Sequence, residues 1–517
     1  MRKTLRRSCE ACAKAKHSCD LRTPRCSRCV KRKCSCVYAN EPLTSTSAHP
    51  GDIGDDFRGA QASRPRTRYV LQLNRREWEG CVSSDLSGTS MFFEAHSFDP
   101  FDSYPSTNLP RLRVQSLMQH FLSKIAFQYY PLDLNPSSNP FVMSWWPLAL
   151  TDPALFHVTL QTASLDDELH ARKGFAHSEL LMKDSVSLLR HKIQDQSLAF
   201  QDATMNAVVT LAAIEHGKGN LQASKVHIDG VKRMVTIRGG LSNVKYTSPL
   251  TARMVPWVAL LVTGAPQFET QDDFGGGDGI CAIRQWHCQL PAENTVPNLI
   301  DFDALGIDPV LGNIVNRLRT VFGVSLPSHD AASLSTTGLH DLTCFVLHRL
   351  LGLPPLTGVG CQSPGISECV RYAVSAYMFI IHGATYYSHA SILNAIVTQL
   401  DFHLGPLLSF VEPQKSLLLW FLCIGAVASS GTNRSHWFRG KAYTISVALG
   451  VQCWDDVEMH LKRVLWLETR SQVLFQEEWE EIISSNPSFH NLATSEEHGQ
   501  ATNVLEYSHS GITRTGV

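Results

Sequence analysis

The chain has 517 residues, 44% of them hydrophobic, which is enough for a large core together with a smaller module. Residues 1–40 hold twelve Lys or Arg against two acidic residues, a net charge of +10, so the remaining 477 residues sum to −11 within a total of −1. A signal peptide and a membrane span are not expected, because residues 1–20 lack an apolar segment and the longest apolar run, 417–428, is short of the about 20 residues that a span needs.

The charge division favours a small basic module that meets a polyanion, attached to a larger acidic body. Without secretion we expect a soluble intracellular protein that does not partner a membrane. Because the cytosol and nucleus keep thiols reduced, a disulfide framework is not expected either.

Seven of the fifteen cysteines lie before position 37. Six of them form two copies of a C-x2-C-x6-C unit, the first beginning at Cys9 and the second at Cys26. Structural zinc takes four thiolate or imidazole ligands, so two zinc ions need eight ligand positions, and six thiolates suffice only if two of them bridge both ions. The pattern therefore predicts two Zn²⁺ per chain, held by Cys9, Cys12, Cys19, Cys26, Cys29 and Cys36. A redox or metal-storage tail is the alternative, but it explains neither the repeat nor the interspersed basic residues.

The seventh thiol is Cys34 or Cys36, since only one of them can complete the second unit. Cys36 reproduces the six-residue interval of the first unit, whereas Cys34 would leave four residues. We therefore assign Cys36 as a ligand and Cys34 as a spare thiol without structural consequence; a redox-sensing role for Cys34 is the alternative.

This stretch resembles the DNA-binding domain of fungal zinc binuclear-cluster (Zn2Cys6) transcription factors. The six cysteine spacings, Lys16, Pro24 and the "CVY" that ends at Tyr38 carry the resemblance. It implies that Cys9 and Cys26 are the bridging thiolates. It also implies that Lys16 reads the guanines of a CGG-like triplet in double-stranded DNA.

The residues between the cysteines are suited to DNA on their own account. Lys14, Lys16 and His17 are expected on a short helical turn that fits the major groove, where lysine can pair with guanine O6 and N7. The other basic residues are expected to contact phosphates and so position the module without reading bases: Lys14, Arg25, Arg28, Lys31, Arg32 and Lys33. A purely phosphate-neutralising Lys16 is the alternative. Three positions that are often basic in the family hold Ala13, Ala15 and Ser18 here, which is expected to weaken phosphate contacts or alter triplet preference.

Residues 1–40 are thus predicted to form the DNA-binding domain and residues 41–110 a mostly disordered linker rich in Pro, Ser, Thr, Gly and Asp. The linker shows no heptad pattern, so coiled-coil dimerisation is not indicated, and a homodimer stays an open possibility. Residues 486–517 are predicted to be a disordered tail.

Residues 111–485 are predicted to form a large all-α regulatory domain. Long apolar segments with few strand signals occur at 111–129, 154–169, 201–216, 221–237, 366–382, 412–430 and 455–468. Met182, Val186, Leu189 and Ile193 step by four, three and four, which predicts one apolar face of a helix. Gly239 and Gly240 are expected to end a helix whose negative end suits Arg238.

Four stretches of this domain resemble the fungal-specific transcription factor regulatory domain, of the type found in many sterol and secondary-metabolism regulators. They are "SWWPLALTDPALFH" (144–157), "HIDGVKRMVTIRGGL" (227–241), "ECVRYAVSAYMFI" (368–380) and "LLLWFLCIGAVASSG" (417–431). Common catalytic motifs are not found, and Cys281, His287 and Cys288 lack a second ligand pair, so we expect neither an enzyme nor a further metal site.

The sequence therefore favours a small Zn2Cys6 module joined by a disordered linker to a large all-α regulatory domain. The function expected is sequence-specific RNA polymerase II transcription regulation in a fungal nucleus, with DNA and the transcription machinery or co-regulators as partners. A secondary-metabolite biosynthetic gene cluster is the candidate target. The alternative is a zinc-dependent protein-interaction module that does not read DNA sequence; the +10 charge argues against it.

Overall fold

The computed structural model describes residues 10–15, 27–32, 104–172, 174–272, 278–288, 299–323, 334–356, 363–410 and 415–484. The chain divides into two compact units, one holding Met1–Arg64 with Glu215–Leu221 and the other Pro65–Ile214 with Gln222–Val517. Most of the predicted linker and the whole predicted tail lie outside the described residues.

The described part of the N-terminal module is a pair of short helices, α1 (Glu10–Lys14) and α2 (Ser27–Lys31), which contact one another. Ala15 N–H donates to the Ala11 carbonyl at 3.1 Å, and Arg32 N–H donates to the Arg28 carbonyl at 3.0 Å. These two bonds join equivalent positions of the two cysteine units, so the predicted repeat is also a repeat of backbone structure. Helices this short are not stable alone.

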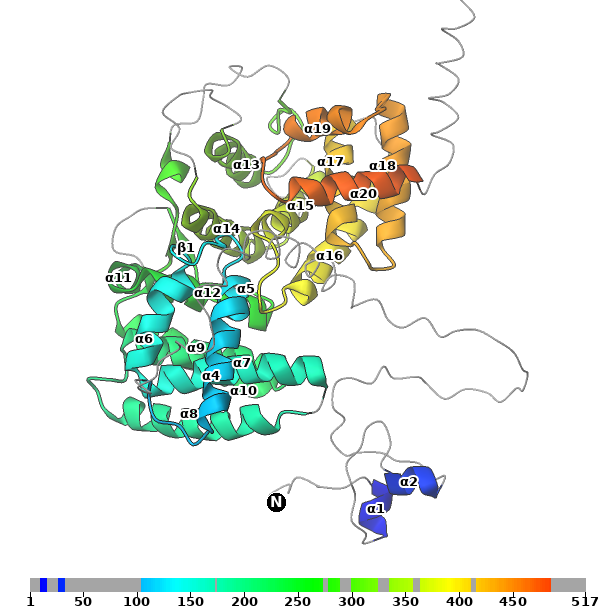
Figure 1. Ribbon diagram of the computed structural model, residues 1–517. Coiled ribbons are helices and arrows are strands. Elements are labelled where there is room, and N and C mark those ends of the chain that lie inside the picture. Colours follow the sequence, from blue (N-terminus) through cyan, green and yellow to red (C-terminus); the bar gives the residue numbers. More distant parts are fainter. Residues whose placement is uncertain are drawn as a thin grey trace, which may run out of the picture. The chain divides into compact units, whose positions relative to one another are not determined.

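The second unit is built almost entirely from helices, and this confirms the predicted fold class (Figure 1). In chain order its elements are α4 (Arg111–His120), the π-helical η2 (Phe121–Ile125), α5 (Ala126–Tyr129), the π-helical η3 (Phe141–Trp145), α6 (Trp146–Thr151), α7 (Pro153–Ala171), α8 (Ala176–Gln194), α9 (Asp202–Gly217), α10 (Leu221–Ile237), α11 (Leu241–Thr247), α12 (Pro249–Thr263), β1 (Thr270–Gln271), β2 (Ile280–Cys281), the 3₁₀ helix η4 (Arg284–His287), α13 (Pro309–Val321), α14 (Thr336–Gly352), α15 (Pro364–His382), α16 (Ala390–Phe410), α17 (Lys415–Ala428), α18 (Ser435–Leu449), α19 (Trp454–Lys462) and α20 (Gln472–Ser484).

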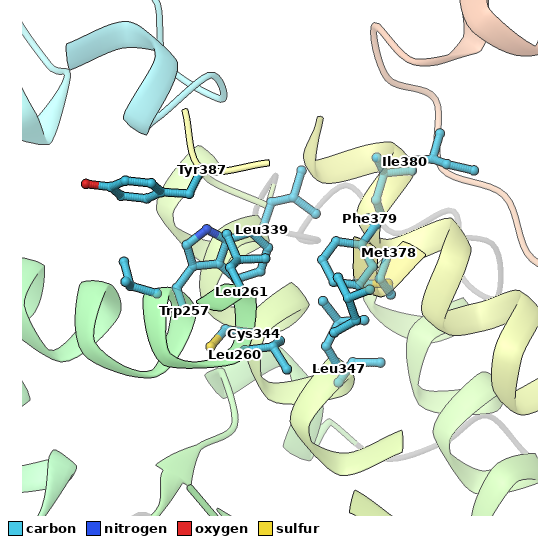
Figure 2. Packing of buried hydrophobic residues seen from close by; sticks show 14 of the residues in the cluster. Trp257, Leu260, Leu261, Leu339, Cys344, Leu347, Met378, Phe379, Ile380 and Tyr387 are labelled. Atoms are coloured by element: carbon cyan, nitrogen blue, oxygen red, sulfur yellow. The ribbon is translucent and has the colours of Figure 1, made fainter. Parts of the chain in front are cut away.

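Helix α15 is central to this unit and contacts α13, α14, α16 and α17 (Figure 1). It is apolar around most of its circumference, as expected of a helix that is covered on all sides. Figure 2 shows its Met378 and Phe379 beside Leu347 of α14, with Leu260 and Trp257 of α12 on the other side of the cluster.

The end of α10 follows the sequence prediction closely. Gly240 N–H donates to the Val235 carbonyl at 2.9 Å and Gly239 N–H to the Thr236 carbonyl at 3.0 Å, the two bonds of a Schellman cap. Gly239 and Gly240 have positive φ angles of 79° and 93°, a backbone conformation that residues with a Cβ atom rarely adopt. Arg238 lies at the negative end of the α10 dipole, as predicted. Its guanidinium also forms an ion pair with Asp202 at the start of α9.

The predicted apolar face of α8 is only partly correct. Leu189 is buried, but Ile193 is 49% exposed. Met182 and Val186 are half-buried and pack against the core, as predicted. The fully buried side also includes Ser178, Leu181 and Ser185, and the hydroxyl of Ser185 donates to Gln161 of α7 at 3.2 Å. Hydrophobicity alone does not reveal that a face is buried through small polar residues.

Three smaller differences concern element boundaries. Helix α19 ends at Lys462, and the buried residues Val464, Leu465 and Trp466 that follow it are not helical, so the apolar run 455–468 is two structures. Tyr104, within the predicted linker, stacks on Phe156 with ring centroids 5.7 Å apart. Finally, β1 and β2 form a two-residue parallel pair within the helical unit.

Candidate metal centre and nucleic-acid interface

Cys12 and Cys29 are the third residues of α1 and α2 and are 2% and 0% exposed. A buried cysteine at the same place on each of two equivalent turns directs both sulfur atoms into the interior of the module. A module with so few apolar residues has little else to bury there. The other predicted ligands, Cys9, Cys19, Cys26 and Cys36, lie outside the described residues, as does Cys34, so the ligand set stays a prediction.

These residues fit a thiolate-bound zinc cluster. Zinc thiolate sites need deprotonated sulfur, and metal binding to such ligands supplies folding free energy that a small core cannot supply. Two zinc ions and six thiolates carry a charge of about −2, which the +10 of residues 1–40 offsets.

Basic residues lie on the opposite side of each turn from the cysteine. Lys14 and Lys31 follow Cys12 and Cys29 by two residues, about 200° around a helix, and both lysines are exposed. Arg32 is also exposed, whereas Arg28 is half-buried. Each turn therefore places a thiol inward and an ammonium group outward, an arrangement suited to phosphate contact. Lys16, His17, Arg25 and Lys33 lie outside the described residues.

The helical unit has a polar interior that sequence reasoning missed. His340 Nδ1 of α14 and His382 Nε2 of α15 are 2.9 Å apart, and the Trp257 ring lies 5.2 Å and 4.3 Å from their ring centroids. Burial lowers the pKa of His340 to about 4 and holds the pKa of His382 well below its usual value. The two histidines are far apart in sequence and share no motif, so no local signal predicts the pair.

Within the described ranges, no group of three or more His, Cys, Asp or Glu residues is placed to hold a metal ion. Cys281 is half-buried and Cys288 exposed. Of the helices in the described part, none has the length and apolar character to cross a membrane.

Two family models match the chain. Residues 7–45 match the fungal Zn(2)-Cys(6) binuclear cluster domain, and residues 116–261 match the fungal specific transcription factor domain. A binuclear cluster domain of this kind binds two zinc ions, and both families are transcription-factor domains rather than enzymes. No curated protein and no solved structure matches the chain.

Proposed function

Because the chain matches a fungal Zn2Cys6 transcription factor with a regulatory domain, we propose that it is a sequence-specific RNA polymerase II regulator that reads CGG-like triplets. Six thiolates hold the two zinc ions: Cys9, Cys12, Cys19, Cys26, Cys29 and Cys36. Lys16 reads the guanines, and the surrounding basic residues position the module on the phosphates. The protein acts in the nucleus. Whether it binds DNA as a monomer or as a homodimer is decided by the number of triplets in the selected sequences.

The observation that carries this proposal is the two-sided character of the repeated turn. Cys12 and Cys29 are buried, and Lys14 and Lys31 are exposed on the far side. Metal binding on the inner side therefore fixes the positions of cations on the outer side. The zinc supplies structural rigidity, and the lysine and arginine side chains make the contacts with DNA.

The experiment is selection of bound sequences from random DNA by the zinc-loaded full chain. We expect enrichment of a CGG-like triplet, with one triplet indicating a monomer and two at a fixed spacing indicating a homodimer. Affinity should fall steeply with salt, with a logarithmic slope of about −0.9 per phosphate contact. Binding with a steep salt slope but no enriched sequence would contradict base reading. An affinity for DNA that does not change with salt concentration would contradict a DNA-binding role altogether.

We further propose that the target genes form a secondary-metabolite biosynthetic gene cluster. The support is the resemblance of the regulatory domain to regulators of that type. Chromatin immunoprecipitation should find bound sites concentrated in one contiguous biosynthetic cluster; sites scattered among unrelated genes would refute this assignment.

A further inference from the structure

Helix α16 has one buried side and one broad exposed face. Its buried side includes Ile396, Leu400 and Leu404, and the helix contacts α15 and α17. The exposed positions recur at helical spacing along the opposite side: Ser391, Asn394, Ala395, Gln399, Phe402 and Pro406. Nothing in the proposed DNA-binding function uses this face.

The exposed face of α16 between residues 391 and 406 carries no charge. Asp401 is the one Asp, Glu, Lys or Arg of the helix, and it points to the edge of the face, where its carboxylate pairs with Arg434 at 2.7 Å. The exposed faces of other long helices do carry charge, such as Arg190 on α8 and Arg233 on α10. Because charged residues are depleted at the centre of protein interfaces, the composition of this face is that of an interface.

A large aromatic side chain lies on this face. Phe402 is 71% exposed, and its ring meets the neighbouring His403 ring edge-on with centroids 5.1 Å apart. Gly405 lies one turn further along, and no described atom lies within 4 Å of the place where its Cβ would be. Aromatic residues are enriched in interfaces, so an exposed phenylalanine within an uncharged helix face is suited to be the anchor of a contact.

The face is complementary to a second copy of itself. Ala395 and Phe402 are seven residues apart, about two helical turns, so a small and a large side chain lie on one line along α16. When two α16 helices pair antiparallel with a two-fold axis beside Gln399, each Phe402 lies opposite the Ala395 of the other copy. An interface between identical copies requires this kind of self-complementary patch. Because the face is uncharged, the two copies meet without like-charge repulsion.

We propose that α16 is the contact through which two copies of this chain form a homodimer, with the two α16 helices antiparallel. The predicted linker has no heptad pattern, so a coiled coil does not supply this contact. A contact between two helices buries less than the about 800 Å² per partner of a standard interface, so the dimer is weak in solution. Two DNA half-sites that hold both copies raise their effective concentration and so strengthen it.

The experiment measures self-association of the zinc-loaded full chain by sedimentation velocity over a range of concentrations, without DNA. We expect a reversible equilibrium between monomer and dimer. Phe402→Glu places a charge in the contact at a position that is exposed in the monomer, so it should weaken the dimer about tenfold or more. Leu180→Glu, at a 60% exposed position of α8, is the matched control and should leave the association unchanged. A chain that stays monomeric at every concentration, or a dimer that Phe402→Glu does not weaken, would overturn the proposal.

A second set of variants tests the antiparallel register. Ala395→Lys alone should weaken the dimer, because a long charged side chain replaces the small one that receives Phe402. Combined with Phe402→Glu, it places a carboxylate opposite an ammonium group twice in each dimer, so the double variant should associate more tightly than either single variant. A double variant that associates no more tightly would contradict the antiparallel pairing. Should Phe402→Glu fail to fold, Ala395→Lys decides by itself, since Ala395 is also exposed.

The contact and the proposed reading of DNA can fail separately, because sedimentation is measured without DNA. A monomeric chain that still enriches a CGG-like triplet would overturn the α16 contact alone. A dimer weakened by Phe402→Glu that enriches no triplet would support the contact and contradict base reading.

Discussion

Cys12 and Cys29 occupy equivalent places on two helical turns, one in each copy of the repeated cysteine unit. Each is buried, each is the third residue of its helix, and each precedes an exposed lysine by two residues. The two halves of the module are therefore built alike around their central cysteine. If the halves are also alike in their last ligand, the interval Cys12-x6-Cys19 requires Cys36 and not Cys34.

The first prediction follows from that equivalence. Cys36→Ser should lose zinc and unfold the module, because the second ion is left with three thiolates and a poor hydroxyl ligand. Structural zinc contributes roughly 10–16 kcal/mol in small zinc domains, so even a partial loss exceeds the stability of about 30 residues. Native mass spectrometry of residues 1–50 should show fewer than two zinc ions per chain.

Cys34→Ser is the matched control, two residues away and equal in chemistry. It should keep both zinc ions. Zinc retained in Cys36→Ser but lost in Cys34→Ser would reverse the assignment, and zinc retained in both would mean that the two thiols substitute for each other.

Lys16→Ala should keep two zinc ions but lose discrimination for the preferred triplet. A bidentate contact with guanine is worth roughly 1–3 kcal/mol, so the affinity for the correct sequence alone should fall about 5-fold to 160-fold. Competition binding against a triplet-scrambled duplex measures this. Lys14→Ala, a phosphate contact in our assignment, should weaken both duplexes alike. Equal weakening by Lys16→Ala would reduce Lys16 to a phosphate contact as well.

A third prediction concerns packing in the helical unit. Gly425 of α17 lies so close to the ring of Phe438 in α18 that an added Cβ would overlap the ring carbons. Gly425→Ala should therefore destabilise the unit by about 1–3 kcal/mol through overpacking. Gly440 of α18 is exposed, with no atom near its missing Cβ, so Gly440→Ala should be neutral or stabilising by up to about 1 kcal/mol. Urea unfolding of both variants tests the pair; equal effects would contradict it.

Local patterns predicted much of this molecule because the information is local. The end of α10 needs two consecutive residues with positive φ, and the adjacent glycines Gly239 and Gly240 reveal this in the sequence. The repeated cysteine interval likewise lies wholly between Cys9 and Cys36. The predicted apolar face of α8 was incomplete because Ser178 and Ser185 are also buried, through hydrogen bonds to α7. A hydrophobic pattern does not reveal which polar residues will find such partners on a neighbouring helix.

The pair formed by His340 and His382 could not be predicted for the same reason. The two imidazoles come from α14 and α15 and lie 2.9 Å apart, although they are 42 residues apart in the sequence.

The last prediction is a loss of stability in mild acid. Burial lowers the pKa of His340, His348 and His389 to about 4, while the unfolded chain keeps values near 6.5. Below pH 6.5 these histidines become protonated in the unfolded chain but stay neutral in the folded unit until the pH approaches 4. Stability is therefore full above pH 6.5 and is lost as the pH falls toward 4, by about 1.4 kcal/mol per pH unit for each such histidine.

Urea unfolding between pH 7.5 and 4.5, followed by tryptophan fluorescence, measures this loss in the helical unit, because residues 1–40 contain no tryptophan. His389→Phe keeps an aromatic ring against Phe379, whose centroid lies 5.0 Å away, but removes one titrating group. It should reduce the slope of stability against pH between 6.5 and 4, whereas His191→Gln, at an exposed position of α8, should not. A slope unchanged by His389→Phe would mean that this imidazole is protonated in the folded state, with its charge accommodated by the surrounding helices.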